Sequence, residues 1–141
     1  MDMTAELAST RQGVLDGLAI YAGLRGTERA DAMRRTVDSG DVGSTMTAMS
    51  MEFVFGQVWS REILDAKQRS LVTIGILIAL RQTEELKNHI RIGLTNGLTV
   101  RQIEEATIQA AAYAGFPAAH TASNAVLEVL QELSFAPPPR T

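Results

Sequence analysis

The sequence predicts an all-α protein, a compact bundle of about six helices. Helix-capping patterns recur along the second half of the chain, and the signals that bound strands are nearly absent. Abundant alanine and glycine let helices approach one another closely. We expect residues 1–135 to form a single domain, because a chain of 141 residues suits one domain and 45% of it is hydrophobic. The proline-rich residues 136–141 are expected to form a flexible tail.

The first half of the chain carries weaker signals. Residues 4–21 and 27–36 have the pattern of helices, joined by the glycine-containing residues 23–26. Residues 39–44 contain two glycines among small residues and predict a loop. A further helix is expected over residues 46–58.

The second half begins with a capping box, in which Asp65 is the N-cap and Gln68 the third helical residue. Residues 69–80 are then apolar almost all round, which is typical of a buried central helix. Their β-branched residues would also suit a strand, but the length of the segment and its cap favour a helix. Thr83 is expected to cap the next helix, which Asn96 and Gly97 end.

Two more helices complete the expected bundle. Thr99 and Gln102 repeat the capping-box pattern and begin a helix that stops at Gly115. The last helix is expected over residues 117–133, with a proline in its first turn.

Composition excludes several classes of function. The chain has no cysteine, which removes disulfides, thiol nucleophiles and cysteine-bound zinc. A net charge of −3 without basic clusters does not suit a nucleic-acid surface. The most apolar stretch, residues 71–80, is about half of the roughly 20 residues that a membrane span needs. We therefore expect a soluble cytoplasmic protein that binds neither nucleic acid nor membranes.

The pair formed by Glu85 and His89 is the sharpest candidate for chemistry. These residues are four apart, so on a helix their side chains share a face one turn from each other. A carboxylate beside an imidazole favours the charged imidazole and fixes the orientation of its ring, which suits proton transfer. From the spacing alone, an ordinary surface pair is the more common explanation, and a half-buried structural histidine is another.

Two further residues are candidates for a site. Arg69, at the start of the most apolar helix, could bind a substrate carboxylate, although an ordinary first-turn arginine is the commoner case. His120, in the first turn of the last helix, could act as a second acid or base, but a helix-end role is more common. Two histidines without cysteine make a poor ligand set, so no metal site is expected.

An ordered set of short motifs resembles the carboxymuconolactone decarboxylase family. The motifs are Phe55-Gly56-Gln57-Val58-Trp59-Ser60-Arg61, Arg69-Ser70-Leu71, Glu85-Leu86-x-x-His89-x-Arg91, Asn96-Gly97-Leu98-Thr99, Ile103-x-Glu105, and the stretch from Gln109 through Tyr113-Ala114-Gly115 to Pro117-Ala118-Ala119. The resemblance implies an all-α, alkylhydroperoxidase-like fold and assembly into trimers or hexamers, with sites near subunit contacts. Relatives of the alkylhydroperoxidase type carry Cys-x-x-Cys where this chain has Gln82 and Glu85, so thiol peroxidase chemistry is excluded.

The resemblance implies a decarboxylase that needs no cofactor and acts on a small carboxylated lactone such as 4-carboxymuconolactone. In that interpretation His89 is the general acid, Glu85 orients it, and Arg69 binds the carboxylate or the enolate oxygen. The substrate-binding residues would be Gln57, Trp59, Tyr113 and His120.

Two departures from the family keep other functions open. Gln57 stands where the family usually has glutamate, and His120 stands where an asparagine or a small residue is more usual. One alternative is an isomerase, cyclase or hydro-lyase that uses His89 and His120 as an acid–base pair. Another is a non-catalytic oligomeric binding protein, which Gln57 favours and the retained Arg69, Glu85 and His89 disfavour.

Overall fold

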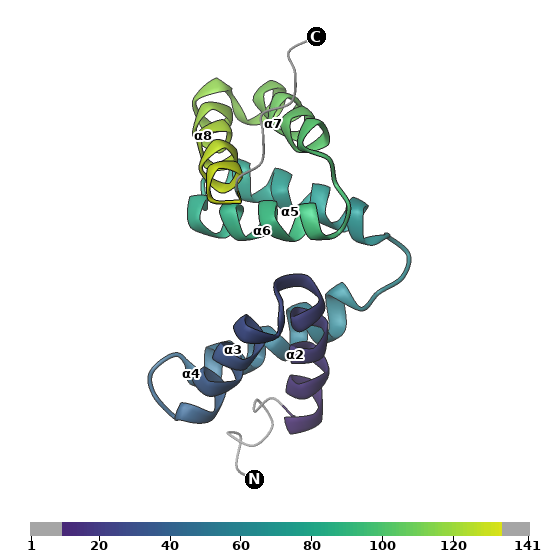
Figure 1. The fold of residues 1–141 in the computed structure, drawn as a ribbon, viewed down its shortest axis with the longest axis vertical. Coiled ribbons are helices and arrows are strands. Elements are labelled where there is room, and N and C mark those ends of the chain that lie inside the picture. The colour runs from purple at the N-terminus through teal and green to yellow at the C-terminus, as the bar shows by residue number, and fades with distance from the viewer. Residues whose placement is uncertain (1–9, 134–141) are drawn as a thin grey trace. The chain divides into compact units, whose positions relative to one another are not determined.

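The computed structural model describes residues 10–133, and every regular element in that range is a helix (Figure 1). The predicted all-α class is therefore confirmed. Two compact units divide the chain, Met1–Ile63 and Leu64–Thr141, and each is described by itself. The single domain over residues 1–135 stays a prediction. The predicted tail at residues 136–141 lies outside the described residues, as do the first residues of the predicted 4–21 helix.

The first unit contains α2 (Arg11–Arg25), α3 (Thr27–Ser39), α4 (Ser44–Ser50) and the π-helix η1 (Met51–Trp59). Helix α2 packs mainly on η1, where the rings of Tyr21 and Phe55 meet edge to face with centroids 5.0 Å apart. The buried apolar residues of the first unit are Val14, Leu18, Tyr21, Ala30, Met51 and Phe55.

Glu52 of η1 ties the two segments together at the beginning of α2. Its carboxylate accepts hydrogen bonds from the Thr10 amide at 3.2 Å and the Thr10 hydroxyl at 2.8 Å. The same hydroxyl caps α2 by accepting from the Gly13 amide at 3.0 Å. A carboxylate next to a helix N-terminus is also favoured by the helix dipole.

Several boundaries in this unit differ from the prediction. Helix α2 continues through Gly23 to Arg25, because a glycine inside a helix costs only about 1 kcal/mol and Gly26, with a φ of 91°, is what ends it. The helix expected over residues 46–58 is present, but its second half is π-helical. Its buried or partly buried residues Met51, Phe55 and Trp59 recur every four residues. That spacing is compatible with an α-helix as well as with the wider turn of a π-helix, so it does not distinguish the two.

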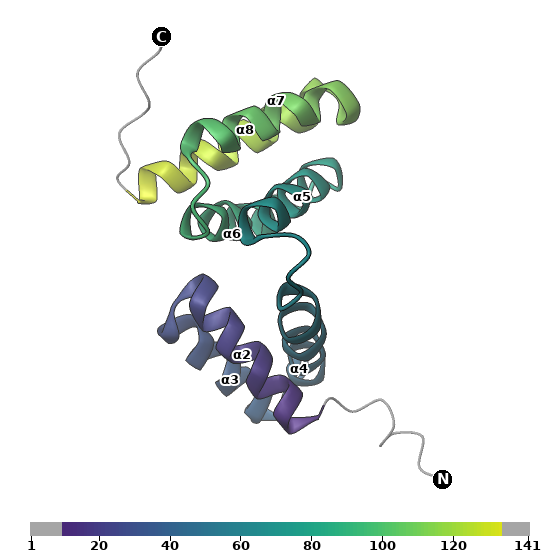
Figure 2. The same ribbon diagram turned by 90° about the vertical axis from the view of Figure 1, so that its right-hand side faces the viewer.

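The second unit contains α5 (Ala66–Ala79), α6 (Thr83–Thr95), α7 (Val100–Ala114) and α8 (Phe116–Glu132). Helices α5 and α6 form one layer and α7 and α8 the other, with α7 against α5 and α8 against α6 (Figure 2). Its core residues come from all four helices and the α6–α7 loop: Ile74, Ile78, Leu86, Ile90, Leu98, Ile103, Ala118, Ala122, Ala125, Val126, Val129 and Leu130. The capping boxes predicted at Asp65 and Thr99 are both confirmed.

Helix α5 is not buried all round, so that prediction is wrong. Ser70, Ile74 and Ile78 are buried, whereas the opposite face is 38–63% exposed at Leu71, Val72, Ile76 and Leu80. The reason is geometric: the neighbouring helices of the unit cover α5 from one side.

Thr83 is also not the N-cap that the sequence predicts. Gln82 holds that position without a side-chain cap, and Thr83 is already the first helical residue. The connection is tight, because the Gln82 amide bonds back to the Leu77 carbonyl at 3.0 Å and Arg81 takes a left-handed φ of 56°. The turn therefore sets where α6 begins.

Arg81→Gly is expected to raise the free energy of unfolding by roughly 0.5 to 1 kcal/mol, because glycine adopts a positive φ without strain. Arg81→Val should lower it by more than about 1 kcal/mol, since a β-branched residue tolerates this conformation poorly. Urea unfolding followed by circular dichroism measures both. Equal stability of the two variants would mean that the turn is not left-handed at Arg81 in solution.

Candidate functional site

Glu85 and His89 lie one turn apart on α6, as predicted. Glu85 is exposed and His89 is partly buried. One carboxylate oxygen of Glu85 accepts a hydrogen bond from the Asn88 side-chain amide at 3.4 Å. The helix and the spacing are thus confirmed, and the interaction between Glu85 and His89 stays a prediction.

Arg69 lies in the first turn of α5 and is partly buried. Its carbonyl oxygen accepts a hydrogen bond from the Thr73 hydroxyl at 2.9 Å. The next residue, Ser70, is fully buried, and its hydroxyl oxygen accepts a hydrogen bond from the Asn96 amide nitrogen at 2.9 Å. Because Asn96 is the C-cap of α6, this bond links the helix of Arg69 to the helix of His89.

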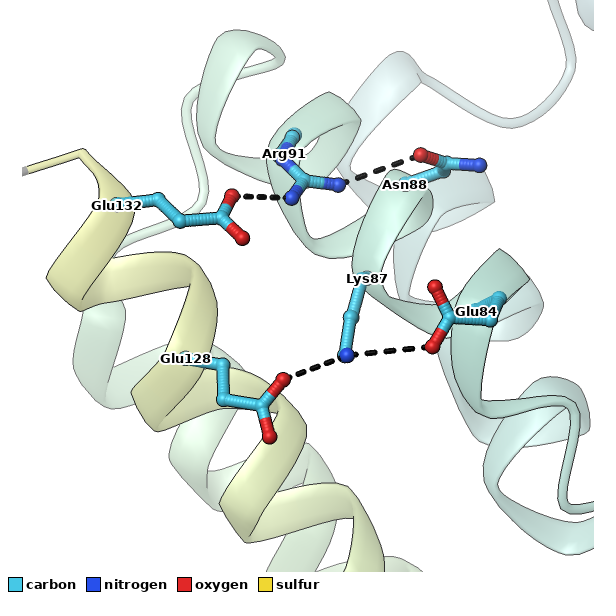
Figure 3. A network of polar contacts seen from close by, with 6 residues as sticks. All are labelled: Glu84, Lys87, Asn88, Arg91, Glu128 and Glu132. Carbon is cyan, nitrogen blue, oxygen red and sulfur yellow. Dashed lines mark hydrogen bonds and ion pairs between the residues drawn. The ribbon is translucent and has the colours of Figure 1, made fainter.

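A network of ion pairs and hydrogen bonds joins another face of α6 to α8 (Figure 3). Lys87 contacts Glu128 at 2.5 Å and Glu84 at 3.2 Å. One turn further on, Arg91 pairs with Glu132 and donates to the Asn88 oxygen at 3.3 Å. The pairs Lys87–Glu128 and Arg91–Glu132 are four residues apart on both helices, so they fix the alignment of α6 along α8.

The stability that the ion pairs of Lys87 contribute should depend on pH. The pKa of Lys87 is raised above its ordinary value of 10.5, first by the hydrogen bond to Glu128 and then by that to Glu84. Because folding raises this pKa, the stabilising contribution is complete below pH 10.5 and is lost as the pH rises through the folded-state value. Lys87→Met should therefore be less stable than wild type near neutral pH, and the difference should vanish in strong alkali.

Urea unfolding near neutral pH and in strong alkali measures the loss of stability in Lys87→Met, with Arg91→Met as the matched control. An arginine keeps its charge in alkali, so the deficit of Arg91→Met should persist there. A deficit of Lys87→Met that is equally large at both pH values would contradict the assignment.

Tyr113 lines a groove between α5 and α7 with a volume of about 570 Å³. Small and apolar residues make up most of its surface, and the polar groups come from α7. The lining residues are Leu71, Gly75, Ala79, Gln102, Glu105, Ala106, Gln109, Ala110, Tyr113 and Ala114. Glu105 and Gln109 were not among the site residues predicted from the sequence. Gln109 lies four residues from Glu105 and four from Tyr113, a spacing that places all three on one face of a helix.

The remaining predicted residues are dispersed. His120 is exposed near the beginning of α8, just past its first turn, with its ring 6.2 Å from that of Phe116. His120, His89 and Arg69 do not line the α5–α7 groove. Gln57 is exposed and Trp59 partly buried on η1, which belongs to the other unit, so their place beside His89 stays a prediction.

Two broader searches cover the part of the chain that the structure describes. Between residues 10 and 133, no three histidine, aspartate or glutamate side chains are grouped so that they could hold a metal ion. Over the same residues, no helix combines the length and apolar character needed to cross a membrane.

Comparison with known proteins finds relatives for the segment that carries these residues. The sequence model of the carboxymuconolactone decarboxylase family matches residues 45–128. The chain is 41% identical over 85 residues to a 4-carboxymuconolactone decarboxylase of Acinetobacter baylyi, covering 60% of this chain and 63% of that protein. It is 46% identical over 66 residues to a nitrosuccinic acid decarboxylase of Metarhizium robertsii, covering 47% and 46% respectively. An uncharacterized 15.0 kDa protein of Paracoccus denitrificans is 36% identical over 91 residues, covering 63% and 65%. The matched part thus spans less than two thirds of each of these relatives.

Proposed function

This chain belongs to the carboxymuconolactone decarboxylase family, and we propose that it is a decarboxylase of small carboxylic acids, with 4-carboxymuconolactone as the preferred substrate. One observation carries the proposal. Residues 45–128, the segment that the family model matches, contain Arg69, Glu85 and His89 on two neighbouring helices. The whole segment is free of cysteine, so thiol chemistry is excluded, and acid–base chemistry is the function that we propose for the histidine.

The chemistry explains why such a reaction can proceed without a cofactor. When CO₂ leaves a γ-carboxylated unsaturated lactone, the electron pair of the broken carbon–carbon bond flows through the double bond into the lactone carbonyl. The protein must bind the carboxylate, stabilise the resulting dienolate oxygen and deliver a proton to carbon. Nitrosuccinic acid has an analogous electron sink, because a nitro group can accept the pair released by decarboxylation of the adjacent carbon.

Each step has a residue to perform it in this proposal. The guanidinium of Arg69 binds the carboxylate or the enolate oxygen through paired hydrogen bonds. His89 gives the proton to carbon, and Glu85, one helical turn away, favours its protonated form. Gln57, Trp59, Tyr113 and His120 are proposed to shape the substrate site.

We also propose that the protein assembles as a homo-oligomer, a trimer or a hexamer. The exposed apolar face of α5 supports this, because contiguous apolar surface usually marks an interaction site. The expected result is a mass of three or six chains by light scattering at micromolar concentration. A monomer under those conditions would contradict the proposal.

The proposed activity is tested by measuring CO₂ release from 4-carboxymuconolactone and, in parallel, from nitrosuccinic acid. We expect turnover of 4-carboxymuconolactone to be the faster. Faster turnover of nitrosuccinic acid would assign the chain to the other substrate. If the folded protein releases CO₂ from neither compound, the decarboxylase proposal is wrong for both.

A further inference from the structure

The hydrogen bond between Asn96 and Ser70 links the two helices that carry the proposed catalytic residues. We propose that Asn96 and Ser70 are positioning residues, which set where Glu85 and His89 lie relative to Arg69. The inference rests on the proposed function for its kinetic consequences. Its structural basis is independent of the substrate, because it concerns the register and rotation of α6 against α5.

The bond is directional and partly buried, with Ser70 on its buried side. Ser70 is fully buried, so its hydroxyl loses its interaction with water on folding and depends on Asn96 instead. The Asn96 amide nitrogen lies 2.9 Å from the Ser70 oxygen and 3.5 Å from the carbonyl oxygen of Ala66. Since an amide group has two N–H bonds, it can serve both acceptors at once. Two contacts one turn apart on α5 define the place of Asn96 along that helix.

The backbone around Asn96 is itself held firmly. Its amide bonds to the Ile92 carbonyl at 2.8 Å, and the Leu98 amide closes the end of α6 on the Gly93 carbonyl at 2.9 Å. Gly97 takes a φ of 96°, which a residue with a side chain rarely adopts. The position of the Asn96 side chain is therefore transmitted to the whole of α6.

His89 and Asn96 are seven residues apart on α6. At 3.6 residues per turn, seven residues are almost two full turns, so the two side chains leave the helix on nearly the same side, about 10 Å apart along its axis. Glu85 lies one turn before His89 and continues the same stripe. A rotation or slide of α6 that broke the bond to Ser70 would move Glu85 and His89 together.

Arg69 lies on α5, the helix to which Asn96 is bonded through Ser70. It directly precedes Ser70 in α5, so the Asn96 bond sets the distance from the guanidinium to the imidazole through two rigid helices. The apolar contacts between α5 and α6 are non-directional and tolerate small slides, whereas a directional hydrogen bond does not. Catalytic groups must be held to within about 0.5 Å, and a misplacement of about 1 Å can cost 100-fold in rate.

We expect Asn96→Ala and Ser70→Ala each to lower kcat for CO₂ release from 4-carboxymuconolactone by about 10-fold to 100-fold. KM should change by less than about 3-fold, because Arg69 still binds the substrate carboxylate. The double variant should be no slower than the slower single variant, since both changes break the same bond. Rates are normalised to the folded fraction measured by circular dichroism.

Thr107→Val is the matched control. Thr107 is also a buried hydroxyl of this unit, but it bonds only within its own helix, to the Glu104 carbonyl at 2.6 Å. It should destabilise the fold to a similar degree and leave kcat within about 2-fold of wild type. A fall in kcat in Thr107→Val equal to that in Ser70→Ala would assign the effect to general destabilisation and overturn the inference.

A second readout is independent of activity. The ¹H–¹⁵N signals of the His89 ring should shift in Asn96→Ala and in Ser70→Ala, and stay in place in Thr107→Val. If wild type releases no CO₂, the proposed function fails and these signals alone decide the inference. Unmoved His89 signals in both Asn96→Ala and Ser70→Ala, with or without activity, would overturn it.

Discussion

His89→Ala is expected to lower kcat for CO₂ release from 4-carboxymuconolactone by about 100-fold to 10,000-fold, the range that a positioned general acid contributes. Without the imidazole, carbon must take its proton from water, which is neither oriented nor held close to the dienolate. The KM should change little, because the charge proposed to bind the substrate carboxylate is on Arg69. Steady-state kinetics with CO₂ detection measures both parameters.

His120→Ala is the control for this prediction, because the chain contains only these two histidines. His120 is exposed on α8. Because it is proposed to shape the substrate site and not to transfer the proton, its removal should raise KM and change kcat by less than about 3-fold. An equally large loss in both variants would favour the alternative in which the two histidines act as an acid–base pair. Full activity of His89→Ala would contradict the proposed mechanism.

The helix order in the second half of the chain could be predicted because its signals are local. The side chains of Asp65 and Thr99 each accept a hydrogen bond from the backbone amide of the glutamine three residues on. The side chain of that glutamine in turn accepts a hydrogen bond from the backbone amide of the N-cap residue. These contacts need nothing beyond four consecutive residues, so the sequence alone specifies them. The glycine ends at Gly97 and Gly115 are local in the same way, since each takes a positive φ.

The predictions that failed depend on contacts outside the short motifs on which they were based. Thr83 has the right chemistry for an N-cap, but the tight turn through Arg81 places it inside α6. Helix α5 is apolar on nearly all sides, yet its burial depends on how many neighbours reach it. The π-helical half of the 46–58 segment packs against α2, and no local pattern in Met51–Trp59 predicts its wider turn.

The candidate site could be predicted only in part. Spacing placed Glu85 and His89 on one face of a helix, and the structure confirms that helix. The bond from Asn96 to Ser70 spans 26 residues, so no periodicity could have revealed it. Glu105 and Gln109 line the groove because α7 lies against α5. This packing is tertiary structure, which the local sequence does not specify.

Gly17→Ala is expected to lower the free energy of unfolding of the first unit by about 3 kcal/mol or more, because overpacking at a rigid contact is among the costliest core changes. A Cβ at Gly17 would lie 1.8 Å from the carbonyl oxygen of Met51 and 2.5 Å from its carbonyl carbon. Both atoms belong to the backbone of η1, so no side-chain rotation can relieve the clash. Helices α2 and η1 would have to separate, which would open the contact between Tyr21 and Phe55.

Gly23→Ala provides the matched control, because it makes the same substitution six residues later in the same helix. Gly23 is exposed, and a Cβ there would meet no atom within 4 Å. Alanine is the better helix former, so this variant should raise the free energy of unfolding by about 0.5 to 1 kcal/mol. Opposite signs for the two variants in urea unfolding would establish that α2 and η1 pack through Gly17. A Gly17→Ala protein as stable as wild type would show that the two helices lie further apart in solution.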